Sequence, residues 1–384
     1  MSKSSPPGPI LLLFEHFSDL QDPRIERTKV YSLQTIVVIS VCAVICGADG
    51  WDDIALFGRA RAKFFRRLLG LRGHTPCADT FRRVFERLEP STFEQCFRRW
   101  VLALGRTFES DVLACDGKSV KRAVDAAQPT VPLHLMHIWS TKQGLLVSQR
   151  AVPGAPGEVA GLLQMLALLD LRGATLTADA NSCTAKVTKA VREAKGDYVL
   201  CLKGNRSTLH QLAKHSFAQA QAQGFAQVAT FEDNSRGHGR QERRVVRALV
   251  PPRWPVAPKS HWTDLNSLVQ VERTRVIQGK STTEHSYYLS SLDPEAERIA
   301  KAIRAHWQVE NQLHWTLDVT FGEDDRRIRD ATSAQNLGMV TRLALCLLKR
   351  EGSNKGSIAQ KRKGAGWSDD YLAKVLCAGL PLSN

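Results

Sequence analysis

The order of predicted elements between residues 111 and 204 constrains the fold of this 384-residue chain more than any other feature. The stretch "DVLACDGKSV" predicts a short strand ending on Asp116 and Gly117, while "LHLMHIWS" and "LLVSQRAV" predict a hairpin joined by "TKQG". The elements that follow are a helix over 158–171, a strand over 173–180, a helix over 183–196 and a strand over 197–204. This alternation predicts a mixed α/β sheet with helices packed on it.

The regions on either side of this segment have different patterns of apolar residues. Residues 26–105 have the apolar periodicity of helices. Residues 225–292 contain alternating runs such as "SLVQVERTRVI" and "HSYYLSSL", which predict a β-rich insertion. Helices are expected again over 303–319 and 333–350, and a polar, glycine-bearing tail precedes one last short helix. The chain is therefore expected to hold a mixed sheet between helical ends.

The charge of the chain narrows the class of partner. The formal net charge is +15, which favours a polyanion, and nucleic acid is the commonest one. From Arg326 to the end, eleven Lys and Arg residues stand against four Asp and Glu, so a localised basic surface is expected there. An anionic membrane is the rival partner, but the sequence offers no cationic amphipathic anchor for it.

Cysteine usage and hydropathy favour a cytoplasmic protein. The nine cysteines include no CxxC pair, and several stand inside apolar runs, which indicates reduced, buried thiols. The apolar run from Ile36 to Gly47 is too short to cross a bilayer and predicts a buried helix. We expect neither a signal peptide nor a membrane partner.

Two aspartates follow buried apolar residues at the ends of neighbouring predicted strands. Asp116 stands in "LACDGK" and Asp179 in "LTADAN". Taken singly, each has the ordinary explanation of capping a strand or the helix that follows. Strand ends of open α/β sheets are also where sites assemble, because side chains there project into a crevice. With Glu310 from a later helix, they form three carboxylates able to hold two Mg²⁺ ions for phosphodiester displacement.

The stretch "IRAHWQVENQLHWTLDV" places one glutamate between two copies of the dipeptide His-Trp. On a helix, His306, Glu310 and His314 are four residues apart and share one face. Simple packing, capture of a zinc ion, or delivery of one carboxylate to a larger site could each explain this pattern. HExxH spacing is absent and the outer histidines stand two turns apart, which disfavours zinc. We expect the histidines to orient Glu310 or touch phosphate, and Trp307 and Trp315 to pack the helix onto the sheet.

The motifs "ACDGKSVKRA", "TADAN", "GDYVLCLKGN", "GHGRQERR" and "RAHWQVENQLHWTLDVTFGEDDRRIR" together resemble the insertion-sequence transposases of the ISAs type, which include the H-repeat-associated proteins. The resemblance runs from about Asp22 to Leu376. It implies an RNase H-like core of the DDE superfamily, with a β-rich insertion before the helix that bears the glutamate. By position, Asp116, Asp179 and Glu310 match the first, second and third acidic residues of that family.

The resemblance also implies a division of the chain into five segments. These are a helical transposase-associated region at 1–108, the first part of the core at 109–224, the β-rich insertion at 225–294, a helical completion of the core at 295–350, and a basic tail at 351–384.

The expected function is a DNA transposase that cuts element ends by metal-dependent hydrolysis and joins the 3′-hydroxyl to target DNA. It implies two Mg²⁺ ions, with Mn²⁺ as a substitute, and a homodimer assembled on double-stranded DNA near the bacterial nucleoid. A catalytically inactive, DNA-binding descendant and a zinc hydrolase centred on the two histidines are the alternatives. Candidate DNA contacts are Lys118, Lys203, Arg236, His238, Arg240, His306, Asn311, His314 and Arg326.

Overall fold

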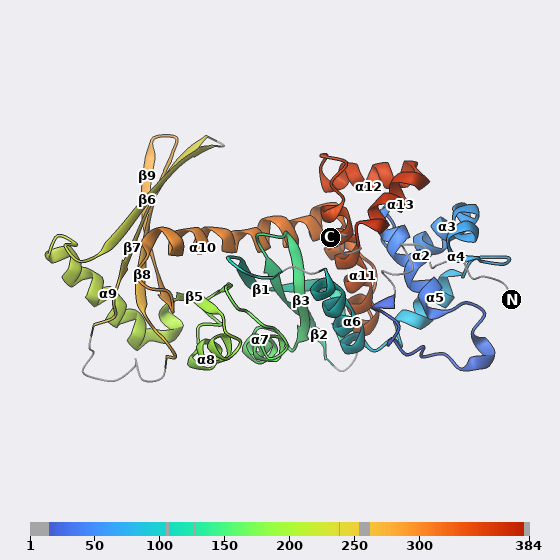
Figure 1. Ribbon diagram of the computed structural model, residues 1–384, viewed down its shortest axis with the longest axis horizontal. Coiled ribbons are helices and arrows are strands. Elements are labelled where there is room, and N and C mark those ends of the chain that lie inside the picture. Colours follow the sequence, from blue (N-terminus) through green and yellow to red (C-terminus); the bar gives the residue numbers. More distant parts are fainter. Residues whose placement is uncertain (1–14, 105–106, 126–127, 238, 253–261, 380–384) are drawn as a thin grey trace.

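A mixed β-sheet runs through the middle of the molecule in the computed structural model, which describes residues 15–104, 107–125, 128–237, 239–252 and 262–379 (Figure 1). Within these residues the sheet has nine strands in the order β3-β2-β1-β4-β5-β9-β8-β7-β6. The strands are β1 Val112–Asp125, β2 Gln128–Ser140, β3 Leu145–Val152, β4 Thr175–Ala178, β5 Asp197–Leu202, β6 Ala229–Gly237, β7 Arg240–Leu249, β8 Ser267–Ile277 and β9 Lys280–Ser290. β1, β2 and β3 form an antiparallel meander, while β4 and β5 run parallel to β1. The expected fold class, an RNase H-like mixed sheet flanked by helices, is confirmed.

Strand β1 is longer than the sequence suggested. It was expected to end on Asp116 and Gly117, but it continues to Asp125 and pairs with β2 through the register Gly117↔Met136 to Val120↔Leu133. The apolar pattern marked only the part of the strand that is covered on both faces. Pairing with the long strand β2 keeps the more polar remainder extended.

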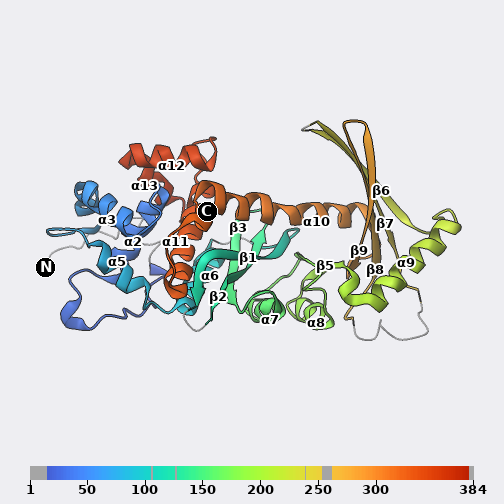
Figure 2. The ribbon, with the colours of Figure 1, turned by 180° about the vertical axis from the view of Figure 1, so that it is seen from behind.

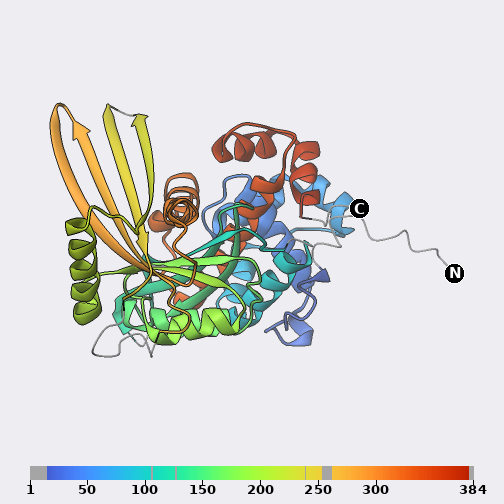
Figure 3. The ribbon, with the colours of Figure 1, turned by 60° about the vertical axis from the view of Figure 1, so that its left-hand side comes forward.

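The strands of the β-rich region extend the same sheet. β9 pairs antiparallel with β5, and β6 to β9 then follow as an antiparallel meander whose hairpins project beyond the rest of the sheet (Figure 3). Helix α9, Ser207–Ala222, precedes them and was not predicted, because its polar sequence offers few apolar residues. The boundaries of the five expected segments stay predictions.

Helices cover both faces of the sheet. α7 Glu158–Leu166 and α8 Ala185–Glu193 bury their apolar residues against one face, in a core that includes Cys115, Leu176 and Leu200. The long helix α10, Ala296–Gln308, crosses the opposite face and packs against Val199 (Figure 2). Side chains therefore alternate between two cores along each central strand, as the twofold period of a strand requires.

The N-terminal and C-terminal helices form one bundle. Its members are α2 Leu33–Ile45, α3 Trp51–Ala60, α4 Ala62–Leu69, α5 Ala78–Phe85, α6 Pro90–Ala103, α11 Ala331–Arg350, α12 Ile358–Trp367 and α13 Asp369–Cys377. α11 lies against α2, both almost wholly buried, and the two last helices contribute Ala365 and Leu372 to the same core. Among the described residues, no helix combines the length and apolarity that crossing a bilayer demands.

The chain beyond Arg326 is less exposed than its charge suggested. The polar stretch expected as a tail forms α12 in its second half, and Lys361 is buried with its ammonium donating to Leu348 O at 2.9 Å. Arg326 and Arg342 are buried as well. Part of the basic excess therefore neutralises helix ends and carboxylates inside the bundle, and only the remainder faces solvent.

Candidate active site

Strand alternation brings the two aspartates to one face of the sheet. On β1, Leu113 and Cys115 enter the core beneath α7 and α8, whereas Ala114 faces the other side. Asp116 is the next residue on the Ala114 side. β4 pairs in parallel with β1 as far as Cys115↔Ala178, so Asp179 follows the last pair beside Asp116. Both carboxylates thus belong to the face that α10 crosses.

Glu310 reaches this face from the end of α10. The α-helix passes into π-helical turns over Val309–His314 and Thr316–Thr320, so the backbone hydrogen bonds change from i→i+4 to i→i+5. Such wide turns occur often at functional sites, because they redirect side chains within a continuous helix. The expectation that Trp307 and Trp315 pack this helix onto the sheet was wrong, because each of these residues is 57% exposed.

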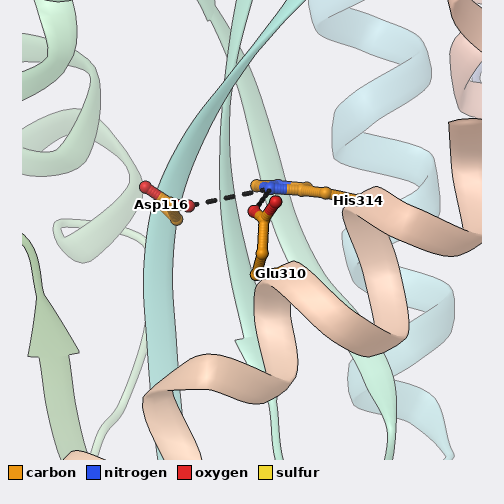
Figure 4. Close-up of side chains that lie close together, drawn as sticks. All are labelled: Asp116, Glu310 and His314. Atoms are coloured by element: carbon orange, nitrogen blue, oxygen red, sulfur yellow. Dashed lines mark hydrogen bonds and ion pairs between the residues drawn. The ribbon is translucent and has the colours of Figure 1, made fainter. Parts of the chain in front are cut away.

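The side chains of Asp116, Glu310 and His314 meet at one point (Figure 4). His314 Nδ1 lies 3.0 Å from Glu310 Oε2 and 3.6 Å from Asp116 Oδ2. Within the part of the chain that the structure describes, one potential ligand atom from each of the three lies within 4.8 Å of the others, a group in which Asp179 takes no part. Asp179 Oδ1 instead accepts hydrogen bonds from the backbone N–H groups of Asn181 and Ser182.

The electrostatics of the site suit a cation. The pKa of Asp116 is raised to about 6: burial is the main cause, His314 opposes it, and the neighbouring carboxylates Asp179 and Glu310 add smaller increases. The hydrogen bond from His314 lowers the pKa of Glu310. Carboxylates crowded in this way repel one another when ionised, and a divalent cation offsets that repulsion. Oxygen donors of this kind are the ligands that Mg²⁺ prefers.

A cavity of about 720 Å³ opens beside these residues, between α10 and the projecting strands, and all three carboxylates line it. Val246, Val271 and Tyr288 give it an apolar wall. Its basic lining residues are Lys203, Arg244, Arg273, Lys301 and Arg304. The cavity therefore has carboxylates at one end and basic and apolar residues along its walls.

Three of the candidate DNA contacts are buried in the protein: Lys118, Arg326 and His314. Lys118 is 7% exposed, and its ammonium lies 2.7 Å from Asp318 and 3.4 Å from Asp324. Arg326 is 8% exposed and donates to Thr341 Oγ1 at 2.8 Å. The sequence placed Lys118 and Arg326 near the site, but the ammonium of Lys118 is held by two carboxylates, and the Nη atoms of Arg326 donate to oxygen atoms of Thr341 and Phe321.

The other candidates divide by exposure. Lys203 is exposed at the cavity, and Arg236, Arg240 and Asn311 are exposed as well. Arg236 and Arg240 flank the tip of the β6–β7 hairpin. His238, between them, lies outside the described residues. These exposed positions stay predictions as DNA contacts.

The two histidines of the α10 segment do not converge on one ion. His306 Nδ1 lies 3.0 Å from Thr177 Oγ1, and burial lowers the pKa of this imidazole. His314 instead contacts Glu310 on one side and His137 on the other. The arrangement gives no support to a zinc site built on both histidines.

The structure adds residues that sequence reasoning missed. His137 on β2 pairs with Asp116 in the β1–β2 register, is wholly buried and contacts His314. Behind it, Arg342 of α11 forms a buried ion pair with Glu323. A histidine inside the apolar run "LHLMHIWS" was the available signal, because a buried polar group needs partners.

A sheet of this topology, with acidic residues on its helix-covered face, defines an RNase H-like core. Two family models match the chain: "DDE_Tnp_1-associated" over residues 14–101 and "Transposase DDE domain" over residues 107–347. The chain belongs to this family of DDE transposases.

Relatives of known sequence match most of the chain. The chain is 30% identical to "H repeat-associated putative transposase YhhI" of Escherichia coli strain K12, over 97% of this chain and 99% of the relative. It is 37% identical to "Uncharacterized protein in dhlA 3'region" of Xanthobacter autotrophicus, over 72% of this chain and 92% of the relative. Among solved structures, a piggyBac transposase synaptic complex with hairpin DNA is similar with 12% identity and a TM-score of 0.42, covering 95% of this chain and 81% of the other.

Proposed function

We propose that this transposase cleaves and joins DNA strands at a site formed by Asp116, Asp179 and Glu310. The observation that carries the proposal is that these carboxylates, far apart in sequence, line one cavity. Asp116 and Glu310 are also bridged by the same imidazole nitrogen of His314. Family membership supplies the class of reaction, and the cavity supplies a place for it.

Asp116, Asp179 and Glu310 would hold two Mg²⁺ ions, with Mn²⁺ as a substitute of similar ligand preference. Bound there, the metal supplies activation of the attacking oxygen and stabilisation of the leaving oxygen. The raised pKa of Asp116 supports the assignment, because its carboxyl lacks a full neutralising partner within the protein.

The reaction would proceed in two displacements at phosphorus. In the first, water attacks at the element end, a new P–O bond forms, and the old P–O3′ bond breaks to leave a free 3′-hydroxyl. In the second, that hydroxyl attacks a target phosphodiester, and the target's own 3′-oxygen leaves. Since two element ends take part, a homodimer assembled on DNA is the expected active form.

Double-stranded DNA would enter along the cavity and the projecting strands. Lys203 lies at the cavity, and Arg236 and Arg240 lie at the tip of the β6–β7 hairpin, where their cations are exposed. Phosphate contacts of this type fix the position of DNA without reading its sequence. They also make affinity fall steeply with salt.

The test incubates purified protein with DNA that carries the element's terminal sequences, with Mg²⁺, with Mn²⁺ or with a chelator. We expect strand cleavage with either metal, and none with the chelator or in an Asp179→Asn variant. Asp170→Asn is the matched control, because Asp170 is an exposed carboxylate paired with Arg172. Cleavage that survives Asp179→Asn contradicts the assignment.

A catalytically inactive, DNA-binding descendant is the second candidate. Such a protein would retain the basic residues that line the cavity but would have lost the ability to cleave DNA. Salt-sensitive binding by the parent protein without cleavage under any metal condition would favour this candidate.

A further inference from the structure

A row of buried groups leads from α11 to the carboxylate of Glu310. Arg342 is wholly buried, and its Nε and Nη2 each lie 3.3 Å from His137 Nε2. His137 Nδ1 lies 3.2 Å from His314 Nε2, and His314 Nδ1 lies 3.0 Å from Glu310 Oε2. His137 is 0% and His314 4% exposed, so water does not compete for these contacts.

The guanidinium of Arg342 fixes the direction of each hydrogen bond between Arg342 and Glu310. A guanidinium has only N–H donors, so His137 Nε2 must accept. Burial, and then the neighbouring Arg342 charge, hold the pKa of His137 well below its ordinary value, which leaves a neutral imidazole with its proton on Nδ1. That proton is donated to His314 Nε2. Because His314 Nε2 accepts this hydrogen bond, the ring proton of His314 sits on Nδ1 and is donated to Glu310 Oε2.

A neighbouring amide agrees with this direction. Gln149 Oε1 lies 3.2 Å from His137 Nε2, and the same amide also neighbours the carboxyl of Glu94. Because amide oxygen and nitrogen are assigned from their hydrogen bonds, turning this amide over lets its NH₂ group donate to His137 Nε2. In that orientation Gln149 is compatible with the accepting role of His137 Nε2.

We propose that Arg342 sets the tautomer of His314 through His137, and that His314 is a positioning residue for Glu310 instead of a metal ligand. This inference rests on the proposed function, since it concerns the same acidic site. His314 offers a ligand atom within 4.8 Å of a carboxylate oxygen of Asp116 and of Glu310. A ring nitrogen that carries a proton, however, has no free lone pair with which to bind a cation. The cation then receives only oxygen ligands, which favours Mg²⁺ and Mn²⁺ over Zn²⁺.

The first test reads the tautomers directly in the metal-free protein. Long-range ¹H–¹⁵N correlation spectra of protein labelled with ¹⁵N-histidine distinguish a proton on Nδ1 from one on Nε2, and His→Asn variants assign the signals. We expect both His137 and His314 to carry the proton on Nδ1. A His314 signal with the proton on Nε2 overturns the proposal, and this result does not depend on catalysis.

A paired variant tests whether Arg342 sets the tautomer. Replacing Glu323 and Arg342 together, by Glu323→Leu and Arg342→Met, removes the ion pair without leaving one buried charge behind. With folding checked by circular dichroism, we expect His137 to lose its single tautomer. If His137 keeps the proton on Nδ1, Arg342 is not the group that sets it.

Metal titration separates positioning from ligation. An asparagine amide nitrogen falls near imidazole Nδ1, so His314→Asn keeps a donor for Glu310, whereas His314→Ala removes it. We expect His314→Asn to bind Mg²⁺ within about threefold of the parent and His314→Ala to bind it on the order of 10- to 100-fold more weakly. Equal losses in both variants overturn the positioning role. A parent protein that binds no Mg²⁺ contradicts the proposed function instead, and the tautomer spectra still decide the inference.

Discussion

The carboxylate of Glu310 and the imidazole of His314 are joined by a 3.0 Å contact within one π-helical turn. The contact lowers the pKa of Glu310 and holds its carboxylate against His314, which also neighbours Asp116 (Figure 4). An acidic residue that is 55% exposed on its side chain is thereby held in one direction. Preorganisation of this kind removes an ordering cost at the moment of ligand binding.

Replacing Glu310 by glutamine should abolish strand cleavage while leaving the fold intact. The amide keeps the size of the side chain but loses the charge that offsets a cation. An increase of several kcal/mol in the activation free energy of cleavage corresponds to roughly a 10³-fold slower rate. Initial rates of cleavage measure it, with Glu297→Gln as the control, since Glu297 is an exposed residue on the same helix. Equal rates in both variants would contradict the role given to Glu310.

Mg²⁺ should raise the melting temperature of the parent protein. A ligand that binds only the folded chain stabilises it by about 2.7 kcal/mol at a hundredfold excess over its dissociation constant. Asp116→Asn should reduce or remove this response, and Asp170→Asn should retain it. Thermal melts at increasing Mg²⁺ check the prediction. A parent protein that melts at one temperature at every Mg²⁺ concentration speaks against a metal at this site.

The pH dependence of stability should reveal Asp116. Its folded pKa of about 6 exceeds its ordinary value of 3.8, so the folded chain holds the proton more tightly than the unfolded chain does. The contribution of this carboxyl to stability is greatest at low pH and is lost as the pH rises through that interval. Without divalent metal, Asp116→Asn should therefore be more stable than the parent at neutral pH, by about 3 kcal/mol at most. Urea unfolding across this pH range measures the difference, which should shrink toward pH 4.

The ion pair of Glu323 and Arg342 should behave as a buried unit. Arg342→Met alone leaves an uncompensated carboxylate in the core and should cost about 3–5 kcal/mol of unfolding free energy. Adding Glu323→Leu should recover most of that loss. Chemical denaturation of the single and double variants tests it. A double variant as unstable as the single one would show that the carboxylate is not the source of the loss.

The exposed tryptophans should contribute little to stability. Trp315→Ser should change the unfolding free energy by less than about 0.5 kcal/mol, because this residue is 57% exposed. Trp100→Ala, in the helical bundle, should cost about 3–5 kcal/mol, because its side chain is wholly buried and its Nε1 donates to Gly379 O. Similar losses in both variants would mean that Trp315 is covered in the folded protein.

Short apolar runs made the central part of the site predictable. Such runs precede Asp116 and Asp179, and a short apolar run is a local property that the sequence displays directly. The pattern correctly predicted the hairpin of β2 and β3 and the strands β4 and β5, whose parallel pairing the structure supplies. It did not predict where β1 ends, because pairing with a distant strand extended it.

Sequence patterns predicted the fold class, which is confirmed, and named three acidic residues as candidates for the site. Which side chains are covered depends on packing between distant segments. Lys118 and Arg326 are buried against acceptors, whereas Trp307 and Trp315 face solvent. The same packing also placed His137 between Arg342 and His314, in a row that joins segments more than a hundred residues apart in the chain. The physical reason is that periodicity reports which side chains share a face, whereas the partner that covers a face is chosen by packing between distant segments.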